Sequence, residues 1–392
     1  MTKEFDIVVH GATGFTGRLV IEYLLSRPAT GLRWAMGGRS LDKLAAVRDA
    51  VGAPADTALV LTDSADPASL AALMARTRLV LTTVGPYQLY GSELVAACAA
   101  HGVDYVDLCG EPAWMRQMID AHQATAQASG ARIVFSCGFD SIPFDLGVLM
   151  LQDEMVQRFG APAARVRGRV RKMKGTFSGG TAASLKATMV AAADPTVLGL
   201  LRNPFALTPG FDGPRQPAGN KPMVDEVLGV WVAPFVMAAI NTRNVHRSNF
   251  LLQHAWGRDF VYDEMLVTGP GDKGQALAEA VAADKSLASD SGPKPGEGPS
   301  RAEREAGFYD VLFIGTGDSG QAAGQTLQVS VRGDRDPGYG STSKMISESA
   351  ICLLQDAQAT PGGIWTPASA LGQPLIRRLQ AFAGLTFTVE GG

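Results

Sequence analysis

Cysteine and histidine are scarce in this sequence. Its 392 residues include four cysteines, Cys98, Cys109, Cys137 and Cys352, and five histidines. No two cysteines form a C-x-x-C pair and the histidines do not cluster, so we expect neither a disulfide framework nor a metal site. Each cysteine lies in an apolar stretch, which is typical of buried, reduced thiols. The pattern predicts a cytoplasmic protein without a bound metal.

A large charge excess and a membrane-spanning run are also missing. The net charge is −3, which argues against general binding of nucleic acid, because that requires a basic surface. The start, MTKEFDIVVHGATG, lacks the pattern of a signal peptide. An apolar run at residues 227–240 is shorter than the about 20 residues that span a bilayer, and it contains Pro234. We predict a buried strand, turn and helix there, with contact to an apolar substrate or a membrane surface as the alternative.

What the sequence does contain is a long series of alternating strands and helices. The length favours two domains, and 46% hydrophobic residues provide for large cores. Short connections between strands and helices predict a parallel sheet covered on both faces, as in a doubly wound α/β fold of the Rossmann type. We therefore predict a dinucleotide-binding domain at residues 1–145. Its strands are expected at residues 5–10, 32–36, 58–61, 78–84, 105–108 and 132–136.

After residue 145 the predicted strands are longer and alternate more regularly. Such strands suit an antiparallel or mixed sheet with one exposed face. We predict a second domain with a mixed sheet at residues 146–335 and a separate C-terminal segment at residues 336–392. The strands of the second domain are expected at residues 165–174, 244–252, 260–267, 309–316 and 326–332.

The sharpest motif is GATGFTG at residues 11–17, between the first strand and an amphipathic helix. Glycines let the backbone turn tightly and approach a pyrophosphate, whose charge is received by the N–H groups and dipole of the helix. The G-x-x-G-x-x-G spacing differs from the commonest dinucleotide form, and a turn that serves only the fold is the alternative. The surrounding strands and helices favour a cofactor site. The predicted cofactor-binding residues here are Gly11, Thr13, Gly14, Phe15, Thr16 and Gly17.

The end of the second strand indicates which cofactor binds. NAD sites usually have an acidic residue there for the ribose 2′-hydroxyl, whereas this chain has Arg39 and Ser40, with Lys43 one helical turn later. Arg39 can pair with a 2′-phosphate and Ser40 can donate a hydrogen bond to it. The pattern predicts NADP(H). An exposed residue at a helix start is the alternative role of Arg39.

The loops after the fourth and sixth strands should pass near the cofactor, because strand ends form the rim of the binding crevice. We predict that Gly85 and Pro86 contact it. Candidate catalytic residues, needed to orient the substrate and supply a proton, are Tyr87, Asp140 and Ser141. Tyr87 either reaches the nicotinamide side or simply packs. Asp140 is either a buried, protonated carboxyl or a cap for the helix that follows it.

Several segments together resemble a known family. GATGFTG, GGRS (37–40), TTVGPYQLYG (82–91), YVDLCGE (105–111) and CGFDSIPFDLG (137–147) resemble the saccharopine dehydrogenase-like oxidoreductases. Within them the chain is most similar to the branch with the trans-acting enoyl reductases, and DPGYGSTSKM (336–345) and GGIWTPASALG (362–372) agree. The resemblance implies an NADPH-dependent reductase with a Rossmann domain, a mixed α/β substrate domain and a C-terminal segment that returns to the first domain. It also implies a double bond on an acyl chain, held by a lipid-building synthase, as the substrate.

The second domain favours an apolar substrate. A saccharopine site must hold several carboxylates, normally with arginine clamps, whereas residues 227–240 and a helix at 184–193 offer apolar side chains. The leading hypothesis is an NADPH-dependent reductase of an enoyl or related double bond on an acyl substrate, carried by a synthase. The alternatives are an NADP(H)-binding scaffold or sensor and a saccharopine dehydrogenase-type C–N oxidoreductase. Homo-oligomer formation and peripheral lipid contact stay open.

Overall fold

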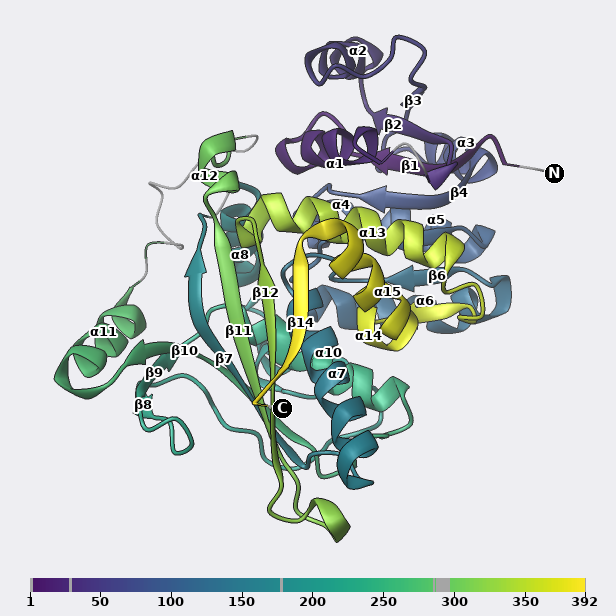
Figure 1. The fold of residues 1–392 in the computed structure, drawn as a ribbon. Helices are drawn as coiled ribbons and strands as arrows, with labels where there is room; N and C mark the ends of the chain where they lie inside the picture. The colour runs from purple at the N-terminus through teal and green to yellow at the C-terminus, as the bar shows by residue number, and fades with distance from the viewer. Residues whose placement is uncertain (1–2, 28–29, 177–178, 285, 287–296, 392) are drawn as a thin grey trace.

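The computed structural model describes residues 3–27, 30–176, 179–284, 286 and 297–391, and it contains two seven-stranded sheets (Figure 1). The first sheet has the order β13-β6-β5-β4-β1-β2-β3 and every pairing in it is parallel. This confirms the predicted Rossmann-type sheet. Its strands are β1 (Phe5–His10), β2 (Trp34–Gly38), β3 (Leu59–Leu61), β4 (Thr77–Thr82), β5 (Asp104–Val106), β6 (Arg132–Val134) and β13 (Gly363–Trp365).

Helices cover both faces of this sheet. Successive residues of a strand point to opposite sides, so the apolar residues of a buried strand contact helices on both faces. Ile7 and Val9 of β1 belong to one core cluster and Val8 belongs to the other. The first face is covered by α1 (Phe15–Leu25), α2 (Leu41–Ala50) and α13 (Thr342–Gln355). The second face is covered by α3 (Pro67–Arg76), α5 (Ser92–His101) and α6 (Pro112–Ser129).

The second sheet is mixed, as predicted, with the order β14-β12-β11-β7-β10-β9-β8. Only the pair β7–β10 is parallel among its described pairings. Helix α7 (Ile142–Phe159) packs closely on it, since a Cβ at Gly147 would lie 2.3 Å from the ring of Phe313. The strands are β7 (Arg165–Lys174), β8 (Met223–Val224), β9 (Trp231–Pro234), β10 (Val261–Gly269), β11 (Phe308–Thr316), β12 (Thr326–Gly333) and β14 (Leu385–Glu390).

The C-terminal segment contributes to both sheets. Strand β13 extends the first sheet beside β6, and β14 pairs with β12 of the second. Helix α13 runs beside α1 (Figure 1). On it, the fully buried Glu348 accepts a hydrogen bond from the Tyr23 hydroxyl (2.7 Å) and pairs with Arg27 (2.8 Å) and Arg378 (2.7 Å). The segment is therefore tied to the Rossmann sheet by a buried charge network. It also includes α14 (Pro367–Ala370) and α15 (Gly372–Arg378).

One predicted strand is wrong. Residues 244–252 were expected in the second sheet, but most of them belong to helix α10 (Ala238–Leu251), which packs against α7 and β10. Many polar side chains of α10 are buried and bonded: Asn244 donates to Ser141, Ser248 donates to Asp145, and Arg247 donates to two backbone carbonyls. A helix whose buried side is polar gives no apolar stripe at helical spacing, so tertiary contacts determine its structure.

The apolar run at 227–240 forms a strand, a turn and a helix start, as predicted, through β9 and the first residues of α10. Across the described ranges, no helix has the length and apolar character that crossing a membrane requires.

All four cysteines are free and buried, also as predicted. The sequence SLASDSGPKPGEGPS at residues 286–300 predicts a polar surface loop, most of which lies outside the described residues. The remaining helices that concern the site are α4 (Tyr87–Tyr90), α8 (Gly179–Ala191) and α9 (Pro195–Arg202).

Candidate functional site

The glycine motif forms a tight turn between β1 and α1. Gly11 has φ of +89°, a conformation that glycine adopts without strain. A Cβ at Gly17 would lie 2.2 Å from the carbonyl oxygen of Gly11 and 2.9 Å from Cα of Ala12. Helix α1 begins after Gly14, which has no side chain to cap it. The first turn of α1 therefore presents its backbone N–H groups at an open end, the arrangement that receives a phosphate.

A groove of about 740 Å³ runs along the carboxyl ends of β1, β2 and β4; we call it the outer groove. Its size is in the range of small-molecule and cofactor sites. It brings together seven of the predicted cofactor-binding residues, which are Gly11, Thr13, Gly14, Phe15, Thr16, Arg39 and Gly85. Arg39 is exposed and forms no ion pair with any residue in the described ranges. Its guanidinium is thus available to an anion in the groove.

Four predicted cofactor residues do not line the outer groove. Gly17 lies beneath the glycine turn, where its missing side chain permits the close approach described above. Ser40 caps α2, because its hydroxyl accepts the backbone N–H of Lys43 (3.3 Å). Lys43 is exposed on that helix, and Pro86 is buried at the start of α4.

Sequence reasoning missed His10, the residue before the glycine motif. It lines the outer groove, is 3% exposed and lies 2.8 Å from the Ser64 hydroxyl through Nε2, while Nδ1 is buried without a partner. Burial lowers the pKa of His10 to about 4, so the ring is neutral at physiological pH. Its position at a strand end, directly before the motif, was the signal that could have identified it.

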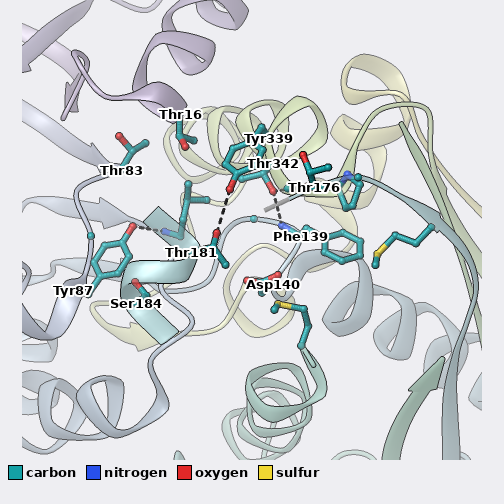
Figure 2. A pocket seen from close by; sticks show the side chains of 18 of the residues that line it. Thr16, Thr83, Tyr87, Phe139, Asp140, Thr176, Thr181, Ser184, Tyr339 and Thr342 are labelled. Carbon is teal, nitrogen blue, oxygen red and sulfur yellow. Dashed lines mark hydrogen bonds between the residues drawn. The ribbon is translucent and has the colours of Figure 1, made fainter. Parts of the chain in front are cut away.

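A second space of about 190 Å³, the inner cavity, adjoins the outer groove. The two share Thr16, Thr83 and Gly85, so the cavity lies at the inner end of the groove. Figure 2 shows polar side chains that line it from distant parts of the chain, among them Thr83 and Tyr87 after β4, Thr181 and Ser184 on α8, and Tyr339 and Thr342 before and in α13.

Residues near the C-terminus form one wall of the inner cavity. The hydroxyls of Tyr339 and Thr181 lie 3.2 Å apart. The Thr342 hydroxyl accepts the backbone N–H of Phe139 (2.9 Å) and donates to the carbonyl of Pro337 (2.8 Å) (Figure 2). Tyr339 and Thr342 were not singled out from the sequence, although they belong to the motif at residues 336–345.

A third space of about 180 Å³, the side cavity, continues from the inner cavity under α8. The two share Leu108, Asp140, Thr181, Ser184 and Met237. Most of its remaining walls are apolar, as suits a hydrocarbon ligand. These walls include Pro112, Leu185, Leu201, Val236, Ala239 and Ile240.

Asp140 lies where the inner and side cavities meet. Within the described ranges its carboxylate has no hydrogen bond and no ion pair, and burial raises its pKa from 3.8 to about 6. It does not cap the following helix: α7 begins at Ile142 with Ser141 as its N-cap residue. The carboxyl is surrounded by protein but is accessible from the cavities, which is a setting for proton exchange with a ligand.

The other two catalytic candidates have different environments. The Tyr87 ring lines the inner cavity, but its hydroxyl accepts the N–H of Leu108 (3.0 Å) and donates to the carbonyl of Thr82 (3.5 Å) (Figure 2). Burial raises the pKa of Tyr87 well above 10. Ser141 is fully buried, accepts a hydrogen bond from Asn244 (2.8 Å) and lines neither cavity.

Two carboxylates hold the loops of the site in place. Glu111 accepts the backbone N–H groups of Tyr87 and Gln88, each at 2.9 Å, and so fixes the loop after β4. Asp107 accepts the N–H groups of Cys109 (3.0 Å) and Ser136 (2.9 Å). The acidic residues of the segment YVDLCGE are therefore bonded to backbone. Among the residues that the structure describes, no group of three or more side chains is arranged to hold a metal ion.

Comparison with known proteins places this geometry in context. Residues 7–134 match the family model described as the saccharopine dehydrogenase NADP binding domain. The chain is 40% identical, over 97% of its length and 96% of the relative, to a Mycobacterium tuberculosis protein provisionally named as a trans-acting enoyl reductase. It is 37% identical to the trans-acting enoyl reductase of Mycobacterium bovis, with 96% of each chain covered.

A solved structure shares the fold over the whole chain. It is the apo saccharopine dehydrogenase (L-Glu forming) of Saccharomyces cerevisiae, with a TM-score of 0.52 and 14% identity, covering 98% of this chain and 99% of that one. This likeness supports the architecture of a Rossmann-like domain with a second mixed sheet.

Proposed function

Because the chain belongs to the saccharopine dehydrogenase-like NADP-binding oxidoreductases, together with the trans-acting enoyl reductases, we propose that it reduces the carbon–carbon double bond of an enoyl group. The substrate would be an acyl chain carried by a separate synthase. One observation carries this proposal: the outer groove, the inner cavity and the apolar side cavity are continuous, and a single unpaired carboxyl, Asp140, lies at the junction of the last two.

The residues of the outer groove fit NADPH, which supplies a hydride when bound. The uncapped first turn of α1 would receive the pyrophosphate, and Gly11 and Gly17 permit the tight turn that leads into this helix. Arg39 would pair with the 2′-phosphate. Thr16, Thr83 and Gly85 line the passage to the inner cavity, where the nicotinamide end would meet the substrate.

We assign Asp140 as the proton donor. Reduction of an enoyl thioester adds a hydride at the β-carbon and a proton at the α-carbon. The protonated carboxyl of Asp140 would give that proton and then regain one from water, so each turnover consumes one NADPH and one proton. The raised pKa supports this role, because a carboxyl with a pKa of about 6 is still partly protonated near neutral pH. Tyr87 and Ser141 would hold the site in shape and would not transfer a proton. Tyr87 forms part of the wall of the inner cavity, and Ser141 anchors the loop that carries Asp140 to Asn244 of α10.

The side cavity would hold the acyl chain. Its apolar walls match hydrocarbon better than an amino diacid, which would need a cation for each carboxylate. Of the described residues that line the inner and side cavities, only Arg243 is a cation. This disfavours a saccharopine-like substrate with several carboxylates.

The experiment that tests the proposal is NADPH oxidation by the purified protein with enoyl thioesters, compared with ketones and imines. We expect oxidation with an enoyl thioester and a saturated product of matching amount. A chain that binds NADPH but oxidises it with none of these substrates would be the scaffold or sensor instead. Oxidation with imines alone would assign it to C–N chemistry.

A further inference from the structure

A buried arginine lies in the wall of the side cavity, where it is the one cation among the described lining residues. Arg243, on α10, is 7% exposed and lines the cavity. Its guanidinium donates to the backbone carbonyls of Ala239, one turn earlier, and of Leu201, at the end of α9. Its Nε is buried without a partner, and no carboxylate pairs with it in the described part of the chain. The cation is therefore held only by neutral groups.

Such an arrangement is unusual because a buried charge is normally paired with an opposite charge. Arg169, which is even more deeply buried, follows that rule and pairs with Asp225 (2.6 Å) and Asp263 (2.9 Å). Burial lowers the pKa of Arg243 only to about 10, so the side chain stays charged at neutral pH. A negative group that complements it is missing from the described protein.

A purely structural role would be to fasten α9 to α10, and Arg247 shows what that role looks like. Arg247 is buried one turn later and donates to the carbonyls of Leu207 and Ile364. Its Nε is also buried without a partner, and burial lowers its pKa to about 9, an effect that the carboxylate of Asp120 partly opposes. It lines neither cavity. Arg243 differs in two respects, because it borders an empty space and has no such carboxylate.

We propose that Arg243 binds an oxyanion of the substrate, a carboxylate or a phosphate, in the side cavity. The ligand then has an apolar part against Leu185, Leu201 and Ile240 and one negative group at Arg243. The reacting double bond would lie toward Asp140, in the adjoining inner cavity. The position of the reacting end of the substrate rests on the proposed function. The oxyanion site adds to that function that the substrate carries one negative charge.

Binding of simple amphiphiles to the full-length protein tests this without any turnover. Titration calorimetry of the protein, saturated with NADP⁺, would compare octanoate, octyl phosphate and octanol. We expect at least one anion to bind about 10- to 100-fold more tightly than octanol, the range of a charge-assisted hydrogen bond. The better of the two anions identifies a carboxylate or a phosphate as the group recognised. Equal affinity for all three ligands would overturn the proposal.

Two variants and a control assign the effect to the residue. Arg243→Gln should remove the preference for the anion, whereas Arg243→Lys should retain part of it. Arg202→Gln, an exposed arginine beside Leu201, should leave it unchanged. An undiminished preference in Arg243→Gln would refute the assignment. If Arg243→Gln does not fold, Leu185→Trp, which fills the cavity from α8, should abolish binding of the anion while Arg243 is present; retained binding would contradict the site.

The outcome is distinguishable from that of the proposed function. Anion binding that depends on Arg243, together with no oxidation of NADPH by any enoyl thioester, would keep the oxyanion site and reject the reaction. Oxidation with a neutral enoyl thioester, together with no preference for octanoate or octyl phosphate, would keep the reaction and reject the site.

Discussion

Replacement of Asp140 by asparagine should abolish the pH dependence of reduction as well as most of its rate. The pKa of Asp140 is raised from 3.8 to about 6 by burial. The acid form is the proposed donor, so activity should be highest below about pH 6 and fall about tenfold for each further unit of pH. At pH 7 about one tenth of the carboxyl is protonated. General acid catalysis typically contributes about 10²- to 10⁴-fold, and we expect Asp140→Asn to lose a factor in this range.

The assay is kcat/KM for NADPH oxidation with an enoyl thioester, measured from about pH 5 to about pH 9, the window that brackets the raised pKa. The variant should give a flat profile and bind NADPH as the parent does. Asp153→Asn, a change at an exposed carboxyl on α7 that lines neither cavity, is the control and should keep the parent profile. A variant that retains the decline above pH 6, or a parent whose rate rises with pH, would refute Asp140 as the donor.

The same pKa shift has a consequence for folding. A carboxyl with a pKa that is higher in the folded state than in the unfolded state stabilises the fold less as the pH rises from about 4 through about 6. Asp140→Asn avoids this loss. After discounting for water in the cavity, it should gain on the order of 1 to 2 kcal/mol in the free energy of unfolding relative to the parent at pH 8. Denaturant titrations at pH 4 and pH 8 would measure the difference, and an equal effect at both would contradict the burial argument.

Three other substitutions test the cofactor site and the C-terminal segment. Arg39→Ala should weaken NADPH binding about 10- to 100-fold and leave NADH binding nearly unchanged; equal losses in fluorescence titrations would remove the 2′-phosphate assignment. Gly17→Ala should abolish NADPH binding, because its Cβ would lie 2.2 Å from the carbonyl oxygen of Gly11; normal affinity would contradict the tight turn. Glu348→Gln removes the buried carboxylate that pairs with Arg27 and leaves Arg378 with Asp356 alone, so it should lower the free energy of unfolding by about 3 kcal/mol. An unchanged denaturant midpoint would show that the buried network contributes little to stability.

Much of the fold could be predicted from the sequence because its signals are local. The strands of the first domain are short, buried on both faces and separated by glycines and helix caps, so their positions follow from pattern alone. The glycine motif needed only its neighbours in the chain to be interpreted. The sequence could not reveal α10, because its buried polar residues are satisfied by partners such as Ser141 and Asp145, more than a hundred positions earlier in the chain.

The inner cavity illustrates the same limit for the site. Asp140 was identified because it follows a strand of a recognised sheet. Tyr339 and Thr342 reach the cavity only because the C-terminal segment folds back; the family resemblance implied that return, but the segment's own pattern did not place these two side chains in the cavity. Arg243 could not be singled out from its neighbours in the sequence, since an arginine in a polar segment is ordinary until burial leaves it without a carboxylate.

The path of the last fifty residues restricts how this protein can open. Strand β13 is hydrogen-bonded into one sheet and β14 into the other. A hinge-like separation of the two halves would have to rearrange the stretch between these strands, which contains α14 and α15, or break one of the two ladders. Entry and release of ligands should therefore depend on smaller displacements near the cavities, and α8, which borders both of them, is the element whose movement would admit a long acyl chain.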